Sequence, residues 1–543
     1  MRRAVLLIAL VACHRNKPPR PLPPLPHAAY AHYLDGKLSA YRDDWSGAAA
    51  ALDDASRAAP DQPMVAVELA RAQQRAKQDA AARRTLADAR VRWPKHAQVW
   101  LASGDLLSTT APLEAIRAYR RAIELEPTDE RPYLGLAKLE QPPNALATLR
   151  RLVKRVPTSI EGHYRLGVRL ATARQLEPAI KELRKVLELD PDHIDARIDL
   201  ARALRRQGHL ADAIAQTRSA FDRSGQAIDL AEELFYLLLE ADDRTAALDL
   251  LTLLDDDRSD PDALATVARL HRGMGRLDDA RAIGTRIAKQ DGELGALVLA
   301  DVDLAAGDHA AAVKRTLAIP EKSDRFTDAR KFAAAALLAA GDPKRAGEVL
   351  APARTAKPDD VDLATAAAFA LADQGKLADA RALLDKLGTG AAQTYAKARL
   401  ADHAGDVTTA LALVEGLVRE KPDLVAALNL AGFLLADANQ RLADAERYLR
   451  HARELSPGDP AILDSWGWLL YRKGEYRAAV RALDRASRFA PREPEILYHL
   501  AAAWAADGAP RTGLATLDSA ATLHPPAHIQ RRIETLRARL AGR

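Results

Sequence analysis

The feature that most constrains this chain is a pair of short amphipathic helices predicted between Ile160 and Pro191. In the first helix one face carries His163, Leu166, Gly167 and Leu170, at the spacing of a helical stripe. Pro178 suits the first turn of the second helix, whose stripe consists of Ala179, Leu183, Val186 and Leu187. Each helix has one narrow stripe, so the pair cannot bury a core alone and must pack against copies of itself.

The period of these pairs carries a resemblance to a known family. Pro157 and Pro191 end successive pairs and lie 34 positions apart. A helix-turn-helix unit of this length resembles the tetratricopeptide repeat, and the matching residues here are Leu166, Gly167, Leu170, Ala179, Leu183 and Pro191. The resemblance implies an all-α superhelical solenoid in which each unit packs on its neighbours. We expect Gly167 to face Ala179 where the paired helices are closest.

The same spacing recurs along most of the chain. Gly275, Gly307, Gly341 and Gly375 mark turns at steps of 32, 34 and 34, and Pro422, Pro457, Pro491 and Pro525 follow at steps of 35, 34 and 34. One unit is short, because only 30 positions separate Pro127 from Pro157 and Gln141-Pro142-Pro143-Asn144 replaces an ordinary turn. We predict about fifteen repeats over residues 28–525. A C-terminal capping helix follows in 526–543, with its apolar side at Ile529, Ile533, Leu536 and Leu540.

The only cysteine of the chain, Cys13, follows two arginines and nine apolar residues, Ala4 to Ala12. That run fits a signal peptide and is too short to span a membrane. Leu10-Val11-Ala12-Cys13 resembles the lipobox of bacterial lipoproteins, which implies cleavage before Cys13 and acylation of this cysteine. An ordinary secretory signal, or a misplaced start with a stray cysteine, is the alternative. His14 follows instead of the aspartate that retains lipoproteins in the inner membrane, so we expect the outer membrane.

The resemblance divides the N-terminal part into a signal peptide, residues 1–12, and a segment with the lipidated cysteine and a proline-rich tether, residues 13–27. Six prolines between positions 18 and 26 favour extended polyproline II. We interpret the segment as a spacer that lifts the array off the membrane. A proline-rich ligand for a partner domain is the alternative.

Composition and motifs argue against an enzyme and against nucleic acid. The 79 basic and 74 acidic residues are spread along the chain, whereas nucleic-acid binding usually shows as a concentrated basic face. The sequence has no G-x-S-x-G, phosphate-loop or H-E-x-x-H motif. Asp255, Asp256, Asp257 and Asp260 lack the alternation and the glycine of a calcium loop and predict an inter-repeat turn. We therefore expect no catalytic residue, metal, cofactor or small-molecule substrate.

The chain resembles periplasm-facing lipoproteins of Gram-negative outer membranes. The features that carry this resemblance are the lipobox, the tether, the repeat array and the segment D-S-W-G-W-L-L-Y-R at 464–472. That resemblance implies a scaffold or adaptor that binds other proteins, for example by docking a processing protease or assembly machinery. Its only membrane contact would be the lipid anchor. The alternative is a component of an exopolysaccharide, pilus or secretin export or assembly machine.

The partner-binding groove is predicted from the phase of the helix at 463–472. If Leu463, Trp466, Gly467 and Leu470 form the packed face, the opposite face carries Asp464, Trp468, Tyr471 and Arg472. The family turns that face toward the concave groove. The preceding unit then adds Asn429, Phe433 and Asp437, and the next adds Tyr498. Tryptophan, tyrosine and arginine are enriched at binding hot spots, so we predict a partner site here. The alternative is that Trp468 and Tyr471 only pack between neighbouring units.

Overall fold

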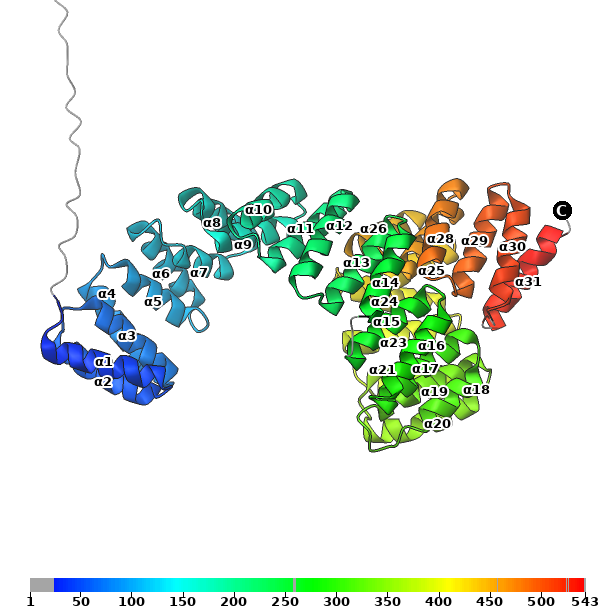
Figure 1. Cartoon of the computed structure of the whole chain (residues 1–543), viewed down its shortest axis with the longest axis horizontal. Coiled ribbons are helices and arrows are strands. Elements are labelled where there is room, and N and C mark those ends of the chain that lie inside the picture. The colour runs from blue at the N-terminus through cyan, green and yellow to red at the C-terminus, as the bar shows by residue number, and fades with distance from the viewer. Residues whose placement is uncertain (1–23, 257–259, 457, 524, 526, 542–543) are drawn as a thin grey trace, which may run out of the picture. The chain divides into compact units, whose positions relative to one another are not determined.

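The structure is a computed structural model that describes residues 24–256, 260–456, 458–523, 525 and 527–541. In these residues it contains 31 α-helices and no β-strand (Figure 1). The first eleven are α1 (His27–Tyr41), α2 (Trp45–Ala58), α3 (Pro63–Arg75), α4 (Asp79–Arg92), α5 (Ala97–Leu107), α6 (Pro112–Leu125), α7 (Arg131–Leu139), α8 (Pro142–Arg155), α9 (Ile160–Thr172), α10 (Leu176–Leu189) and α11 (Ile194–Gln207). The next ten are α12 (Leu210–Arg223), α13 (Ile228–Glu240), α14 (Arg244–Asp256), α15 (Pro261–Gly273), α16 (Leu277–Ala288), α17 (Gly292–Ala306), α18 (His309–Leu317), α19 (Phe326–Ala339), α20 (Pro343–Ala356) and α21 (Val361–Asp373). The last ten are α22 (Leu377–Asp385), α23 (Ala391–His403), α24 (Val407–Glu420), α25 (Val425–Asp437), α26 (Leu442–Leu455), α27 (Pro460–Arg472), α28 (Tyr476–Phe489), α29 (Pro494–Ala506), α30 (Pro510–Ala521) and α31 (Ala527–Ala541).

The helices form consecutive pairs, from α1 with α2 to α29 with α30, and α31 remains as a single helix at the end. This arrangement confirms the predicted all-α repeat array of about fifteen units. The array begins with α1 at His27, and α31 occupies most of the segment 526–543. Cys13 and the predicted signal peptide lie outside the described residues. Within the described residues, every helix is too short or too polar to cross a membrane.

Close packing inside a pair depends on a small residue in the first helix. A Cβ added to Gly167 would lie 2.8 Å from Cγ of Leu183 and 3.5 Å from the backbone oxygen of Ala179. Ala179 and Leu183 are fully buried. The predicted close approach of Gly167 and Ala179 is therefore confirmed, and a larger side chain at position 167 would force the two helices apart.

Glycine also ends several first helices in the middle of the chain. Gly275, Gly307, Gly341 and Gly375 have φ angles of 76°, 82°, 77° and 79°, in the left-handed region that favours glycine. Each stands two residues before a second helix, which begins at Leu277, His309, Pro343 or Leu377. The predicted turns of these four repeats are thus confirmed.

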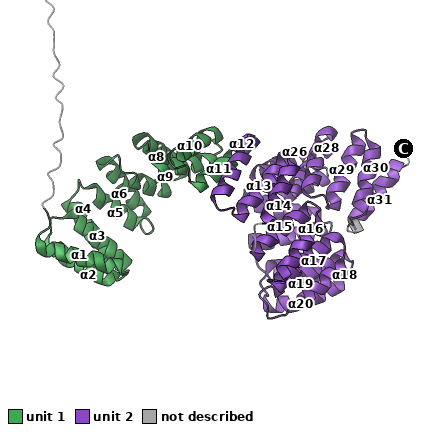
Figure 2. Ribbon diagram, in the orientation of Figure 1, with its two compact units in different colours: residues 1–203 green, residues 204–543 purple. Residues whose placement is uncertain are grey.

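The chain divides into two compact units, residues up to Ala203 and residues from Leu204 (Figure 2). We call them unit 1 and unit 2; α11 spans the boundary. The sequence predicts one continuous array, and its repeat pattern gives no sign of this division.

Within unit 2, repeats that are far apart in sequence touch each other. Leu463, Phe489 and Ile496 pack against Tyr236 and Leu239 of α13. An Nη2 of Arg485 in α28 lies 3.1 Å from Oε1 of Glu240 at the end of α13. The backbone oxygen of Ala305 in α17 accepts a hydrogen bond of 3.0 Å from Nε of Arg492, just before α29. The rotation that accumulates from pair to pair in a solenoid thus brings the end of unit 2 back against its beginning.

Candidate protein-interaction surface

The predicted groove residues lie on three first helices of successive repeats, α25, α27 and α29. Two faces of α27 are used at once. Leu463, Gly467 and Leu470 pack against α28, where a Cβ on Gly467 would come within 2.5 Å of Leu483. The opposite face carries Asp464 and Trp468 toward α25 and α29. The phase predicted for this helix therefore describes its packing against α28.

Asp437, at the end of α25, joins three helices through its carboxylate. Trp468 donates from Nε1 to Oδ1 at 3.0 Å, and Arg532 of α31 donates to Oδ2 at 2.9 Å. Arg472 donates to the backbone oxygen of Asp437 at 2.7 Å and to Oδ1 at 3.3 Å. Charge-assisted bonds of this kind are the strong class of hydrogen bond. Asp437 therefore fixes α25, α27 and the capping helix α31 to one another.

Electrostatics keep Asp437 ionised. Its burial raises the carboxyl pKa, but the charge of Arg532 and the hydrogen bonds from Arg532 and Trp468 outweigh burial and leave the pKa below its ordinary value. The neighbouring Asp402 of α23 behaves in the opposite way, because burial and the charge of Asp437 raise its pKa.

Trp468 lies at the centre of an aromatic stack and is only 3% exposed. Its ring stacks on Tyr471 at 4.7 Å between centroids and on His499 at 4.1 Å. The guanidinium of Arg472 lies 4.8 Å from the same ring, within the range of a cation–π contact. Tyr498 approaches at 6.2 Å. Trp468 therefore packs between first helices of neighbouring repeats, and a partner could not reach much of it in this conformation.

Beneath Trp468 lies a buried ion pair. His499 of α29 is fully buried, and its Nδ1 lies 2.9 and 3.0 Å from the two carboxylate oxygens of Asp464, which is 7% exposed. Burial lowers the pKa of His499, but the charge and hydrogen bond of Asp464 outweigh it and raise the pKa above its ordinary value. Phe433 lies 6.2 Å from the His499 ring.

The eight predicted residues thus form two layers. Asp464 and Trp468 are buried, and Asp437 is partly buried beside them. Asn429 lies two helical turns before Asp437 on α25, partly exposed, and its buried Oδ1 has no hydrogen-bond partner among the described residues. The remaining predicted residues are also partly exposed. Together with Arg532, whose guanidinium lies 6.0 Å from the Tyr498 ring, they form what we call the C-terminal surface: Phe433, Tyr471, Arg472, Tyr498 and Arg532.

Two residues of this site are absent from the sequence-based prediction. His499 follows Tyr498 and lies 35 positions after Asp464, about one repeat, so the spacing alone could have paired them. Arg532 lies 95 positions after Asp437. It is one of several arginines in the capping helix, and no periodicity distinguishes it from the others.

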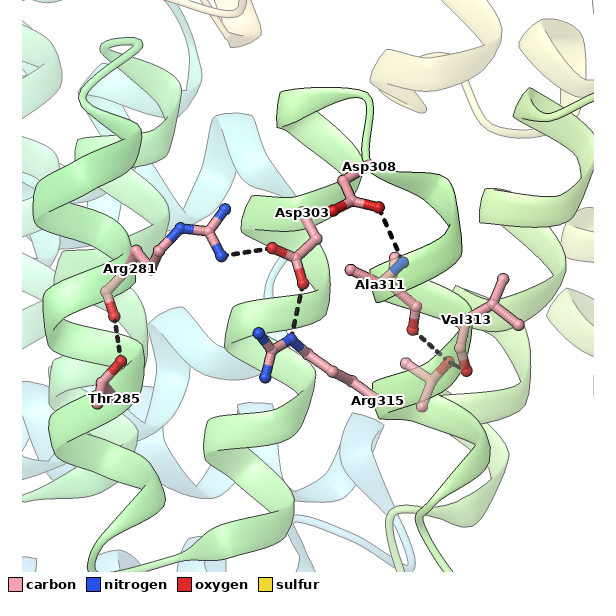
Figure 3. A network of polar contacts seen from close by, with 9 residues as sticks. Arg281, Thr285, Asp303, Asp308, Ala311, Val313 and Arg315 are labelled. Carbon is pink, nitrogen blue, oxygen red and sulfur yellow. Dashed lines mark hydrogen bonds and ion pairs between the residues drawn. The ribbon is translucent and has the colours of Figure 1, made fainter.

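A second buried carboxylate, Asp303 of α17, has a structural role. It is 1% exposed. Arg281 of α16 donates to it at 2.5 Å and Arg315 of α18 at 2.7 Å (Figure 3). Two arginines satisfy both oxygens, as a buried carboxylate requires, and tie three consecutive helices together. Asp308 caps the start of α18 by accepting a bond of 3.0 Å from the Ala311 N–H (Figure 3).

The acidic segment predicted as an inter-repeat turn begins inside a helix, because Asp255 and Asp256 form the end of α14. Its described carboxylates make protein contacts. Asp255 pairs with Arg286 at 2.5 Å, and Asp260 caps α15 by accepting from the Ala263 N–H at 2.9 Å. Asp257 lies outside the described residues. Within the described part of the chain, no group of three or more histidine, cysteine, aspartate or glutamate residues is arranged to hold a metal ion.

Comparison with known protein families matches tetratricopeptide repeats at residues 170–230, 337–402 and 465–528. The last of these segments includes Trp468, Tyr498 and His499. Among curated proteins, the TPR repeat-containing protein PA4667 of Pseudomonas aeruginosa is 36% identical over 106 residues, which are 20% of this chain and 18% of that protein. The match therefore spans less than a fifth of the relative's length.

Among solved structures, yeast Tom70 aligns over 83% of this chain and 97% of its own, with 14% identity and a TM-score of 0.36. The Cut9–Hcn1 assembly of the APC/C aligns over 94% and 96%, with 14% identity and a TM-score of 0.33. Tetratricopeptide arrays generally bind other proteins and are typically non-catalytic. Three separate segments of this chain are recognised as tetratricopeptide repeats, in agreement with the helix pairs of the structure.

Proposed function

We propose that this protein is a scaffold that binds other proteins in the bacterial cell envelope, anchored to the outer membrane through Cys13 and facing the periplasm. The observation that carries the binding role is the C-terminal surface, where aromatic rings and two arginines lie partly exposed over a fixed base. Its chemistry matches that of binding hot spots, in which tyrosine and arginine are enriched.

The buried layer explains how this surface is held in place. Trp468 stacks under Tyr471, and Asp437 binds both Arg472 and Arg532. Side chains that are already fixed lose less conformational entropy when a partner binds. In this proposal Trp468 and Asp464 position the surface, and Tyr471, Tyr498 and the arginines contact the partner.

The proposed cellular role is that of an adaptor, which would bring a processing protease or an assembly machine to the membrane. Its support is the lipobox-like segment before Cys13, together with recognised repeats at residues 465–528. A long array suits this role, because separate segments of one chain can hold separate proteins.

Photo-crosslinking tests the binding surface. A benzophenone amino acid at Tyr471 or Tyr498 should crosslink a common partner in intact envelopes. The matched control is Tyr41 at the end of α1, which is 88% exposed and lies in unit 1, outside the C-terminal surface. Equal crosslinking of that partner from Tyr41 would contradict a specific site.

Substitution separates binding from stability. Tyr471→Ala with Tyr498→Ala should abolish partner recovery and lower stability by less than Trp468→Ala does, because both tyrosines are partly exposed whereas Trp468 is buried. Trp468→Ala should lower stability by about 3–5 kcal/mol, the usual cost of truncating a buried aromatic residue. If the double tyrosine variant still recovers every partner of the parent protein, the binding site lies elsewhere.

Membrane fractionation tests the anchor. Cys13→Ser should leave the protein unlipidated, and it should no longer sediment with membranes, because stable attachment needs acyl chains. The parent protein should be found with the outer membrane on a density gradient. Complete retention of Cys13→Ser in the membrane pellet would refute the lipoprotein hypothesis, and parent protein in the inner-membrane fraction would refute the location.

A further inference from the structure

The short repeat between Pro127 and Pro157 leaves a gap in unit 1. Proline disfavours a helical conformation in the residue before it, and Gln141, before Pro142, is extended with φ −62° and ψ 153°. α7 must therefore end early, and it has 9 residues where α9 has 13. Four residues correspond to about 6 Å of helix. The C-terminal turn of α9 therefore extends beyond the end of α7.

Ligand pockets typically have volumes of about 300–1,000 Å³. The cleft between α7, α8 and α9 has a volume of about 620 Å³. Its apolar floor includes Leu146 and Leu149 of α8 and Val168 of α9. Leu149 is fully buried and Leu146 nearly so, so the floor belongs to the core of unit 1. The cleft exists because α7 is too short to cover it.

Cations line the rim of this cleft. Lys138, Arg165 and Arg169 contribute to the lining, which contains no carboxylate. Arg165 is neutralised in part by Glu161, at 2.5 Å. Arg169 donates to the neutral backbone oxygen of Ala137 at 3.0 Å, and Lys138 is exposed with no ion-pair partner among the described residues. The rim therefore carries uncompensated positive charge over an apolar floor.

We propose that this cleft, which we call the α7–α9 cleft, is a second docking site that takes an acidic segment of a partner protein. An apolar side chain of that segment would fill the space over Leu146, Leu149 and Val168. Aspartate or glutamate beside it would meet Lys138 and Arg169. This site goes beyond the proposed function of the C-terminal surface and shares no residue with it.

Charge decides against the chain's own N-terminal segment as the occupant. Residues 1–23 contain Arg2, Arg3, Arg15, Lys17 and Arg20 and no acidic residue. Such a segment would be repelled by the rim, because like charges in proximity cost free energy. An acidic peptide has the complementary charge.

Peptide selection on the full chain tests the proposal. A phage-displayed library of random dodecapeptides should yield binders with an apolar residue flanked by aspartate or glutamate. Thr172→Trp, which places an indole in the cleft from an exposed position of its lining, should weaken these peptides at least about tenfold. Lys138→Glu should weaken them about five- to tenfold, because it reverses a charge on the rim.

Matched controls distinguish the cleft from general effects. Thr109→Trp adds the same ring to the exposed turn after α5, and Lys154→Glu reverses an exposed charge on α8 outside the cleft lining. Both should bind the selected peptides as the parent does. The double variant Tyr471→Ala with Tyr498→Ala should also bind the selected peptides as the parent protein does. Failure of the cleft proposal can therefore be distinguished from failure of the proposed C-terminal surface.

Three results would overturn the proposal. One is a selection that yields no binder, or only binders that Thr172→Trp leaves unaffected. Another is a dimer of the parent protein in sedimentation that Thr172→Trp dissolves, because the cleft would then hold a second copy of the chain. The third is binding to phosphatidylglycerol vesicles that Lys138→Glu abolishes while no acidic peptide binds, which would assign the cleft to anionic lipid.

Discussion

Units 1 and 2 are built from the same helix pair but differ in how far their contacts reach. In unit 1 hydrogen bonds join neighbouring repeats, as from Tyr164 to Asp199, 35 positions on. In unit 2 Arg488 pairs with Asp242, 246 positions away, and Arg492 binds Ala305 across 187 positions. A repeat rule fixes the contacts between neighbours. It does not determine whether repeats that are far apart in sequence also contact each other. Because unit 2 has such contacts, the two units should differ in folding cooperativity.

The candidate binding sites show a related contrast. In unit 1 the α7–α9 cleft is open because one helix is short. In unit 2 the face expected to line a groove is filled, since Trp468 and His499 occupy the space between first helices of successive repeats. At these two candidate sites a partner would therefore meet a cavity in unit 1 and an aromatic surface in unit 2.

The largest expected effect comes from truncating matched core leucines. Leu183 in unit 1 and Leu483 in unit 2 are both fully buried and both pack on a glycine of the first helix, Gly167 or Gly467. Leu183→Ala and Leu483→Ala should each cost about 2–5 kcal/mol. Hydrogen exchange should increase only near α9 and α10 for Leu183→Ala.

For Leu483→Ala the increase should also reach α13 and α17, because α28 and the segment before α29 hold those helices. The test is exchange mass spectrometry of both variants under one set of conditions. Equal confinement of the two effects would show that closure of unit 2 adds no cooperativity.

A smaller effect should follow from removing one carboxylate charge. Glu240 accepts Arg205 at 2.5 Å and lies 3.1 Å from Arg485. In unit 1 Glu140 accepts Arg120 at 2.9 Å and Thr148 at 2.6 Å. Both side chains are mostly buried, so Glu240→Gln and Glu140→Gln should each cost about 1–2 kcal/mol.

The two glutamine variants should differ in where they loosen the protein. Glu140→Gln should affect α6, α7 and α8 alone, whereas Glu240→Gln should also release α28, which is distant in sequence. Added salt should mimic only a small part of the Glu240→Gln effect in the parent, because screening acts weakly on ion pairs that are mostly buried. If α28 stays as protected in Glu240→Gln as in the parent, the ion pair does not hold the closure.

The local repeat could be predicted from the sequence because its causes are local. Gly167 opposite Ala179, the turn glycines from Gly275 to Gly375 and the short unit before Pro157 each follow from spacing and from backbone preference. The division near Ala203 and the closure of unit 2 could not be predicted. They depend on small rotations that accumulate over eight helix pairs, from α13 to α28.

The candidate site was predicted in part for the same reason. One helical phase placed Asp464, Trp468, Tyr471 and Arg472 on a common face, and the structure gathers them with Phe433, Asp437 and Tyr498. Burial was not evident, because the next first helix covers the same face and its position depends on the superhelix. Whether the C-terminal surface binds a partner remains a prediction for the crosslinking experiment.

The smallest expected effect is a difference in pH dependence between two histidines, one in each unit. The pKa of His499 lies above its ordinary value of about 6.5 because Asp464 outweighs burial. Protonation thus favours the folded state, and this stabilisation is complete below about pH 6.5 and lost as pH rises through the raised pKa. For His96 in unit 1, burial lowers the pKa. Burial thus favours the neutral form of His96 in the folded state. The corresponding stabilisation is present above about pH 6.5 and is lost as pH falls.

Protection of α29 should therefore decrease from pH 6 to pH 8 by an amount that His499→Gln removes, after correction for intrinsic exchange. Protection of α5 should change in the opposite direction by an amount that His96→Gln removes. If the pH dependence of α29 protection is the same in His499→Gln as in the parent, the Asp464–His499 pair does not stabilise unit 2.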